Sequence, residues 1–253
     1  PATGAPLMAA APQRLPDFLV LGNQKGGTTS RQQLLGHHPE VFLAAGKEVH
    51  YFSLHHDQPL SWYAAHYATA AAEQRCGDIT PFYLFHPEIP GRIRALLPQV
   101  KLIALLRDPV ERALSQVFHA RRLGFEPLEP AEALAAEPAR LASGDPFSLQ
   151  KHSYVARSRY LEQLQRYEAL FPADQLLVLR SEDLFQDTAR VWGRILRFLE
   201  VAAMPLPMTL PRANAGRGEA DAVPDAIRDD LRTALRPTAT GVRARYGFGW
   251  DWA

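Results

Sequence analysis

The sequence predicts a three-layer α/β fold in which a central parallel sheet is flanked by helices. Short apolar runs at 17–22, 101–106 and 175–179 have the length and composition of buried strands. Helical patterns lie between these runs, an order that gives a parallel sheet with right-handed crossovers. The chain has 253 residues, 47% of them apolar, which is enough for one sizeable α/β core.

Local signals place the individual elements. One helix is expected to begin at Pro109, where the missing N–H of the first turn costs nothing. Another carries Val191, Ile195 and Leu199 on one face. In chain order, the expected strands are 17–22, 75–79, 101–106 and 175–179, and the expected helices are 28–36, 109–123, 128–144 (a surface helix or lid), 153–170 and 187–199.

The ends of the chain differ from its body. Residues 1–16 are rich in Ala and Pro and lack the charged start and long apolar centre of a signal peptide. We therefore expect a flexible leader at 1–16 and a single domain at 17–253. The segment 206–222 contains Pro, Gly and Asn without a period and predicts a loop.

Composition excludes several classes of protein. The net charge of +1 argues against bulk nucleic-acid binding. Cys76 is the only cysteine, so no intrachain disulfide can form, and no Cys/His cluster indicates zinc. No apolar run approaches the roughly 18 residues of a membrane span. We expect a soluble cytoplasmic protein without a transmembrane segment, and the Ala-, Arg- and Pro-rich composition suggests a bacterial source.

The segment after the first strand, 22–30, reads GNQKGGTTS and is a candidate phosphate loop. Between a strand and a helix, backbone N–H groups and the positive helix end can hold an anion. The two central glycines allow close approach, and the hydroxyls and the lysine add donors and charge. The residues expected to contact the anion are Lys25, Gly26, Gly27, Thr28, Thr29 and Ser30.

This loop predicts a P-loop-like fold but departs from the Walker A pattern G-x-x-x-x-G-K-[ST]. Gly22 and Gly27 have the right separation, yet Thr28 stands where the lysine belongs, and the lysine lies earlier at Lys25. This departure argues against an ordinary nucleotide kinase, although a kinase remains the alternative function. A structural Gly-rich turn is the other alternative.

From this loop onward the chain resembles a known family. K-x-G-T-T-S after the first strand resembles the 5′-phosphosulfate-binding loop of sulfotransferases that use 3′-phosphoadenosine 5′-phosphosulfate (PAPS). DITPFYLF at 78–85 is similar to the "K-[ST]-P-x-Y" segment of heparan-sulfate-type members, with Ile79 in place of the usual lysine. Their "HP-x-V … K-E-x-H-F-F" stretch is matched by His38, Pro39, Val41, Lys47, Glu48, His50, Tyr51 and Phe52.

A second candidate anion site is RDPVERALS at 107–115. Arg107 ends a strand and can grip a phosphate through two N–H groups, Ser115 lies about two turns into the next helix, and Asp108 can cap that helix. Alone, the pattern fits a capped helix with a surface ion pair equally well. It resembles the family's R-D-P-x-x-R-x-x-S motif, which implies that Arg107 and Ser115 bind the 3′-phosphate of the donor.

Two C-terminal segments extend the resemblance. NAGRG at 214–218 resembles the family's "K-G-R" loop over the nucleotide, which implies donor contacts from Asn214, Gly216 and Arg217. Asn214 stands where lysine is common, and a plain solvent loop is the alternative. GWDW at 249–252 resembles the family's "F-D-W" terminus, whose tryptophans we expect to seal the core edge.

The resemblance implies sulfuryl transfer from PAPS, with adenosine 3′,5′-bisphosphate (PAP) as product and no metal required. Glu48, beside apolar and aromatic residues, is the candidate base, although a surface Glu paired with Lys47 is the structural alternative. Lys25 would neutralise the bridging oxygen as it leaves. His119, on the helix face of Ser115, is the third catalytic candidate, and His50 is a further possibility.

The acceptor stays open at this point. The resemblance implies a hydroxyl or amine on a carbohydrate, lipid or small metabolite, because acceptor loops vary independently of the donor fold. A catalytically silent protein that binds a nucleotide or glycan is another alternative. We expect no nucleic-acid partner, and the oligomeric state is open.

Overall fold

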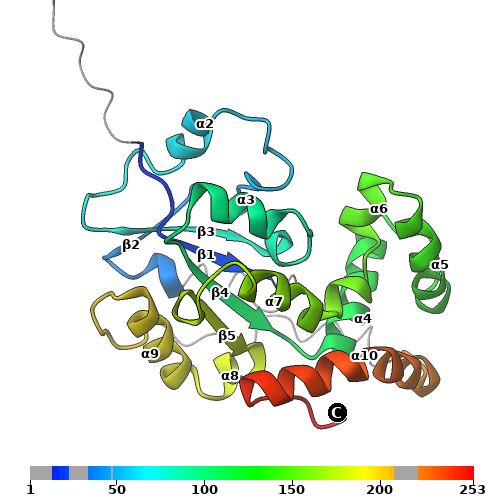
Figure 1. Ribbon diagram of the computed structural model, residues 1–253. Helices are drawn as coiled ribbons and strands as arrows, with labels where there is room; N and C mark the ends of the chain where they lie inside the picture. The colour runs from blue at the N-terminus through cyan, green and yellow to red at the C-terminus, as the bar shows by residue number, and fades with distance from the viewer. Residues whose placement is uncertain (1–12, 23–33, 47, 208–221) are drawn as a thin grey trace, which may run out of the picture.

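A computed structural model describes residues 13–22, 34–46, 48–207 and 222–253. Within these residues, five parallel strands form one sheet in the order β2-β3-β1-β4-β5. Figure 1 shows the strands as arrows lying side by side, with helices around them. This confirms the predicted three-layer α/β fold. The strands are β1 (Phe18–Leu21), β2 (Val41–Leu43), β3 (Arg75–Thr80), β4 (Lys101–Leu106) and β5 (Leu176–Arg180).

The central strands are continuous apolar runs because helices cover both of their faces. All four residues of β1 are buried, and so are the last five of β4. Parallel sheets require such burial on both sides, which removes the alternation of apolar and polar residues seen in half-exposed strands. The expected strands at 75–79, 101–106 and 175–179 therefore match the observed strands within one residue at each end.

Different helices cover the two faces of the sheet. On one face lie α3 (Ile89–Leu96), α7 (Tyr160–Glu168) and α10 (Asp225–Tyr246), which share a core cluster with Leu19 and Leu21. On the other face lie α8 (Ser181–Gln186) and α9 (Thr188–Leu199), which pack on Phe18 and Val20. Adjacent residues of β1 thus point to opposite layers, as strand geometry requires.

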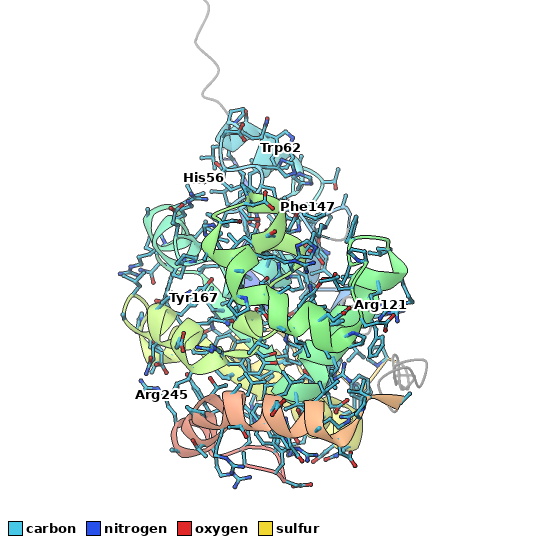
Figure 2. The ribbon with its side chains drawn as sticks, turned by 90° about the vertical axis from the view of Figure 1, so that its right-hand side faces the viewer. His56, Trp62, Arg121, Phe147, Tyr167 and Arg245 are labelled. Carbon is cyan, nitrogen blue, oxygen red and sulfur yellow. The ribbon has the colours of Figure 1, made fainter. Side chains whose placement is uncertain are left out.

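Helix α4 (Pro109–Arg122) follows β4 in the chain. Two smaller helices, α5 (Pro130–Ala142) and α6 (Pro146–Lys151), come after it. Val117 and Ala120 of α4 form a buried cluster with Ala133 of α5 and with Tyr154. Figure 2 shows this group from its outer side. Helix α5 lies inside the predicted surface helix at 128–144, and the predicted helix at 109–123 ends one residue early.

Several parts of the fold differ from the sequence prediction. The helices α2 (Leu60–Ala65), α3, α6 and α8 were not predicted. Strand β2 was not predicted, since it has only three residues and only Val41 is buried. The predicted helix at 153–170 is divided into a 3₁₀ turn η2 (Ala156–Ser158) and α7, because the backbone of Arg159 between them is not helical, with φ −81° and ψ 62°. Helix α10 was not predicted because Pro237 interrupts an otherwise regular apolar stripe.

The structure bears on a few remaining expectations. Of the expected leader, residues 13–16 are described, and Arg14 lies 3.3 Å from Asp17. The loop expected at 206–222 falls mostly outside the described residues. Among the helices that the structure describes, none is both long and apolar enough to cross a membrane.

Candidate active site

The site lies at the carboxyl ends of the strands, where the chain changes direction across the sheet. From β1 the chain moves to β2 and β3 on one side, and it then crosses to β4 and β5 on the other. Ligands of open parallel sheets bind at such a switch point. Because β1 and β4 are hydrogen-bonded neighbours, the two candidate anion segments leave adjacent strands at the same edge.

Gly22 begins the first anion segment in a conformation that requires glycine. Its φ of +35° lies in the left-handed region, and its N–H donates to the Pro81 carbonyl at 3.0 Å. A β-carbon there would stand 2.5 Å from Leu84 Cδ2. The turn out of β1 is therefore closed to side chains. The expected anion contacts that follow, Lys25, Gly26, Gly27, Thr28, Thr29 and Ser30, lie outside the described residues.

The second anion segment is built around the start of α4. Asp108 caps the helix, since its Oδ1 accepts the N–H groups of Val110 and Glu111 at 2.8 and 3.1 Å. Its other oxygen accepts the indole N–H of Trp252 at 2.7 Å. Arg107 follows β4 directly, and Ser115 is half-buried on α4. The predicted cap is confirmed, whereas the phosphate contacts of Arg107 and Ser115 stay predictions.

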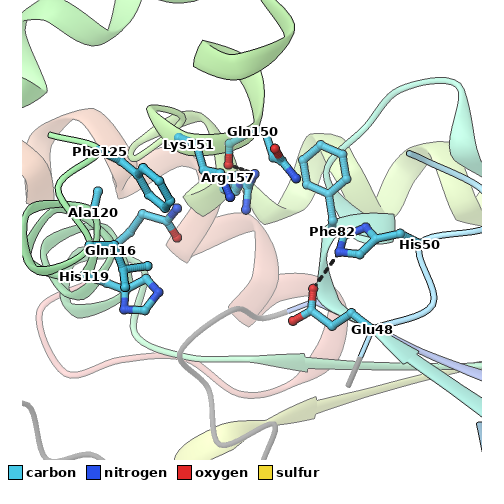
Figure 3. A pocket seen from close by; sticks show the side chains of 11 residues that line it. Glu48, His50, Phe82, Gln116, His119, Ala120, Phe125, Gln150, Lys151 and Arg157 are labelled. Carbon is cyan, nitrogen blue, oxygen red and sulfur yellow. Dashed lines mark hydrogen bonds and ion pairs between the residues drawn. The ribbon is translucent and has the colours of Figure 1, made fainter. Parts of the chain in front are cut away.

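A pocket of about 100 Å³ next to α4 brings together Glu48, His50 and His119 (Figure 3). Glu48 and His50 follow β2, and His119 stands on α4, so these residues come from opposite sides of the sheet centre. The sequence singled out all three. The full lining comprises Glu48, His50, Phe82, Gln116, His119, Ala120, Leu123, Phe125, Gln150, Lys151 and Arg157.

His50 holds the Glu48 carboxylate in place. The imidazole Nε2 lies 2.9 Å from Glu48 Oε2, and Nδ1 lies 2.9 Å from the Ser53 hydroxyl. Because an ionised carboxylate only accepts hydrogen bonds, this geometry assigns the donor role to Nε2. The backbone φ of His50 is +57°, which is a left-handed conformation. The Glu48 side chain is 29% exposed, so solvent can reach it.

A buried carboxylate supports this turn from below. Asp78 is fully buried and accepts hydrogen bonds from the hydroxyls of Tyr63, Tyr83 and Thr80 at 2.9, 3.0 and 2.6 Å. Burial raises the pKa of Asp78, and the three hydroxyls oppose that effect. The Thr80 oxygen in turn accepts the His50 N–H at 3.4 Å. A continuous network thus runs from the end of β3 to the Glu48–His50 pair.

One side of the pocket, formed by Gln150, Lys151 and Arg157, was not predicted from the sequence. Gln150 and Lys151 come from α6, and Arg157 comes from the turn η2. The Lys151 ammonium lies 4.8 Å from the Phe125 ring centre. No local signal marks these residues. Gln150 and Lys151 lie outside the expected helices, and the segment is placed by the packing of α6 on α5 and of η2 on α4.

The expected donor contacts near the C-terminus and the expectation that no metal is required both stay predictions. Asn214, Gly216 and Arg217 lie outside the described residues. In the described parts of the chain, no group of three or more His, Cys, Asp or Glu residues is placed to hold a metal ion.

Comparisons with known proteins agree with this arrangement. Residues 15–210 match the family model described as sulfotransferase domain. Human heparan sulfate glucosamine 3-O-sulfotransferase 3A1 is 32% identical over 79% of this chain and 48% of its own length. Mouse heparan sulfate glucosamine 3-O-sulfotransferase 6 is 30% identical over 94% of this chain and 75% of its own length. The chain thus spans about half the length of the human relative.

Solved structures share the fold. A sulfotransferase from Alicyclobacillus acidocaldarius has a TM-score of 0.79 and 26% identity, covering 94% of this chain and 99% of that chain. Mouse sulfotransferase SULT7A1, crystallised in complex with PAP, has a TM-score of 0.59 and 14% identity, covering 92% of this chain and 88% of that chain. The second likeness concerns the fold alone.

Proposed function

We propose that this chain, which belongs to the sulfotransferase family, moves the sulfuryl group of PAPS to an acceptor hydroxyl or amine. One observation carries the proposal. Glu48, His50 and His119 surround one pocket, and that pocket lies at the sheet edge from which both candidate anion segments leave. The base and a donor with two anionic ends can therefore meet at one place.

The proposed donor is held at both ends. Lys25 to Ser30 after β1 would take the 5′-phosphosulfate, and Arg107 with Ser115 would take the 3′-phosphate. Asn214, Gly216 and Arg217 would close over the nucleotide. The complex of SULT7A1 with PAP, a protein of the same fold, supports this choice of donor. No metal ion is invoked, because protein cations can balance the charge of a sulfuryl group.

Glu48 acts as the base in the proposed reaction. A lone pair of the acceptor oxygen or nitrogen attacks sulfur, and the bond between sulfur and the bridging phosphate oxygen breaks. Its electron pair stays on that oxygen, whose charge Lys25 balances, and the acceptor proton passes to Glu48. His50 orients the Glu48 carboxylate through the 2.9 Å contact, and His119 faces the same space.

The proposed acceptor is a carbohydrate or a small metabolite. Both curated relatives described above carry the name of glucosamine 3-O-sulfotransferases, which supports a sugar hydroxyl. The half-buried polar side chains of Gln150 and Lys151 at the pocket suit an acceptor with several hydroxyl groups.

Two measurements test the proposal. PAP should raise the melting temperature without Mg²⁺, and by more than AMP does, because only PAP engages both anion segments. Equal shifts from both nucleotides would contradict the 3′-phosphate assignment, and a shift by Mg-ATP alone would favour a kinase. Mass spectrometry of candidate acceptors after incubation with PAPS should then show added sulfate. Donor binding without consumption of PAPS would indicate a silent binding protein.

A further inference from the structure

Arg157 lies between the candidate base and the start of the donor loop. It lines the pocket that contains Glu48 and His119. It also lines a smaller neighbouring pocket together with Gly22, the residue at which the chain leaves β1 for the loop that would hold the phosphosulfate. Of the described residues that line these two pockets, only Arg157 borders both. Arg157 therefore lies beside both the candidate base and the strand end at which the donor loop begins.

The guanidinium of Arg157 is held rigidly. Only 6% of the residue is exposed. The charged group lies 4.6 Å from the ring centre of Phe82 and 5.2 Å from that of Phe85. Nε donates to the Ser153 hydroxyl at 2.8 Å, and Nη2 donates to the Gln150 carbonyl at 2.5 Å. Figure 3 shows its nitrogens directed into the pocket. Such fixed donors suit a charge that develops during reaction, because they need no reorganisation.

The charge itself is retained at neutral pH. Burial, followed by the nearby guanidinium of Arg112, lowers the pKa of Arg157 to about 9, and the charges of Glu48 and Glu137 oppose this effect. A cation buried to this degree is costly unless anions offset the loss of water. Glu48 lines the same pocket as Arg157. An anion that entered this pocket would meet a positive charge that is largely withdrawn from water.

We propose that Arg157 is a further catalytic residue, whose guanidinium binds the non-bridging sulfuryl oxygens of the donor during transfer. The inference rests on the proposed function. A guanidinium carries a delocalised positive charge that attracts anionic oxygens. Glu48 lies across the pocket from Arg157 (Figure 3), so the base and this cation would act on different parts of the reacting group.

Binding of PAPS and of PAP distinguishes this role from a structural one, because the two nucleotides differ by the sulfuryl group alone. Isothermal titration calorimetry would compare the parent protein with Arg157→Gln. We expect PAPS affinity to fall roughly 10- to 100-fold, the effect of losing a charge-assisted hydrogen bond, while PAP affinity stays within about twofold. With an acceptor, kcat should fall about 100-fold. Arg157→Lys keeps the positive charge but lacks the planar guanidinium, so it should recover part of the loss in PAPS affinity and part of the loss in kcat.

Arg159→Gln is the matched control, since Arg159 is two positions away, half exposed, and 3.9 Å from Glu162. It should change neither affinity. Equal weakening of PAPS and PAP in Arg157→Gln, or no weakening of either, would overturn the inference. Melting curves report whether the variant folds, and if Arg157→Gln does not, the ratio of the two affinities in Arg157→Lys decides. A parent protein that binds neither nucleotide would instead contradict the proposed function.

Discussion

The imidazole Nε2 of His50 lies 2.9 Å from the Oε2 of Glu48, although a single residue separates them in the sequence. Residues at this spacing point to the same side of an extended chain. The backbone of His50 is nevertheless left-handed, with φ +57°. The hydrogen bond from its N–H to Thr80 stabilises that conformation. Non-glycine residues at positive φ cluster at functional sites.

Loss of the proposed base should remove most turnover. Glu48→Gln keeps the shape of the side chain but cannot take a proton, so kcat should fall roughly 10²–10⁴-fold while donor affinity stays nearly unchanged. Glu73→Gln, an exposed glutamate before β3, is the control. Steady-state kinetics with calorimetry of PAP checks both. Activity within a few-fold of the parent would reject Glu48 and direct attention to His119 or His50.

Loss of the orienting contact should have a smaller effect. His50→Asn introduces a side chain that tolerates positive φ, but it removes the imidazole that contacts Glu48. We expect kcat to fall about tenfold through misplacement of the base, with melting temperature within a few degrees of the parent. His55→Asn, at an exposed position, serves as the control. An unchanged kcat in His50→Asn would show that Glu48 needs no support from this side chain.

The two anion segments should have different kinetic signatures. Lys25 would contact charge that grows as the bridging oxygen leaves, so Lys25→Ala should mainly lower kcat. Arg107 would hold a 3′-phosphate that does not change, so Arg107→Ala should mainly raise the donor KM. Donor calorimetry beside steady-state kinetics separates the two. If Lys25→Ala loses only affinity and Arg107→Ala only turnover, the two assignments are reversed.

Acid should weaken the contact between α5 and the end of α4. The Glu126 side chain is fully buried. Burial alone would raise its pKa, but hydrogen bonds from Arg140, Tyr154 and the Leu128 N–H outweigh burial and lower the pKa to about 2. A carboxyl with a depressed folded-state pKa stabilises the protein fully above its ordinary value of 4.5, and this contribution is lost as pH falls toward 2.

Glu126→Gln should therefore destabilise the protein at pH 7, by about 1–3 kcal/mol. The difference in melting temperature from the parent should narrow as pH falls from 4.5 toward 2. Glu162→Gln, an exposed partner of Arg159, should show almost no difference at any pH. A gap between parent and Glu126→Gln that stays constant across this range would contradict the assigned pKa shift.

Much of the fold was predictable because its signals are local. The run at Lys101–Leu106 has strand length and is apolar throughout its buried part, and the aspartate and proline that follow it specify where α4 begins. Strand β2 and helix α10 escaped prediction because three residues, or a stripe broken by Pro237, carry too weak a period.

The candidate site divides in the same way. The sequence by itself determined Glu48, His50 and His119 as candidates, because each belongs to a short pattern of residues. Only the tertiary structure decided that they share one pocket, since Glu48 and His50 follow the edge strand β2 and His119 stands on α4. It also decided the place of Arg157, which depends on Tyr154 packing against Val117 and Ala120 of α4. Contacts between segments so far apart in the sequence arise from the burial of side chains. A local sequence pattern does not indicate which distant segment its residues will contact.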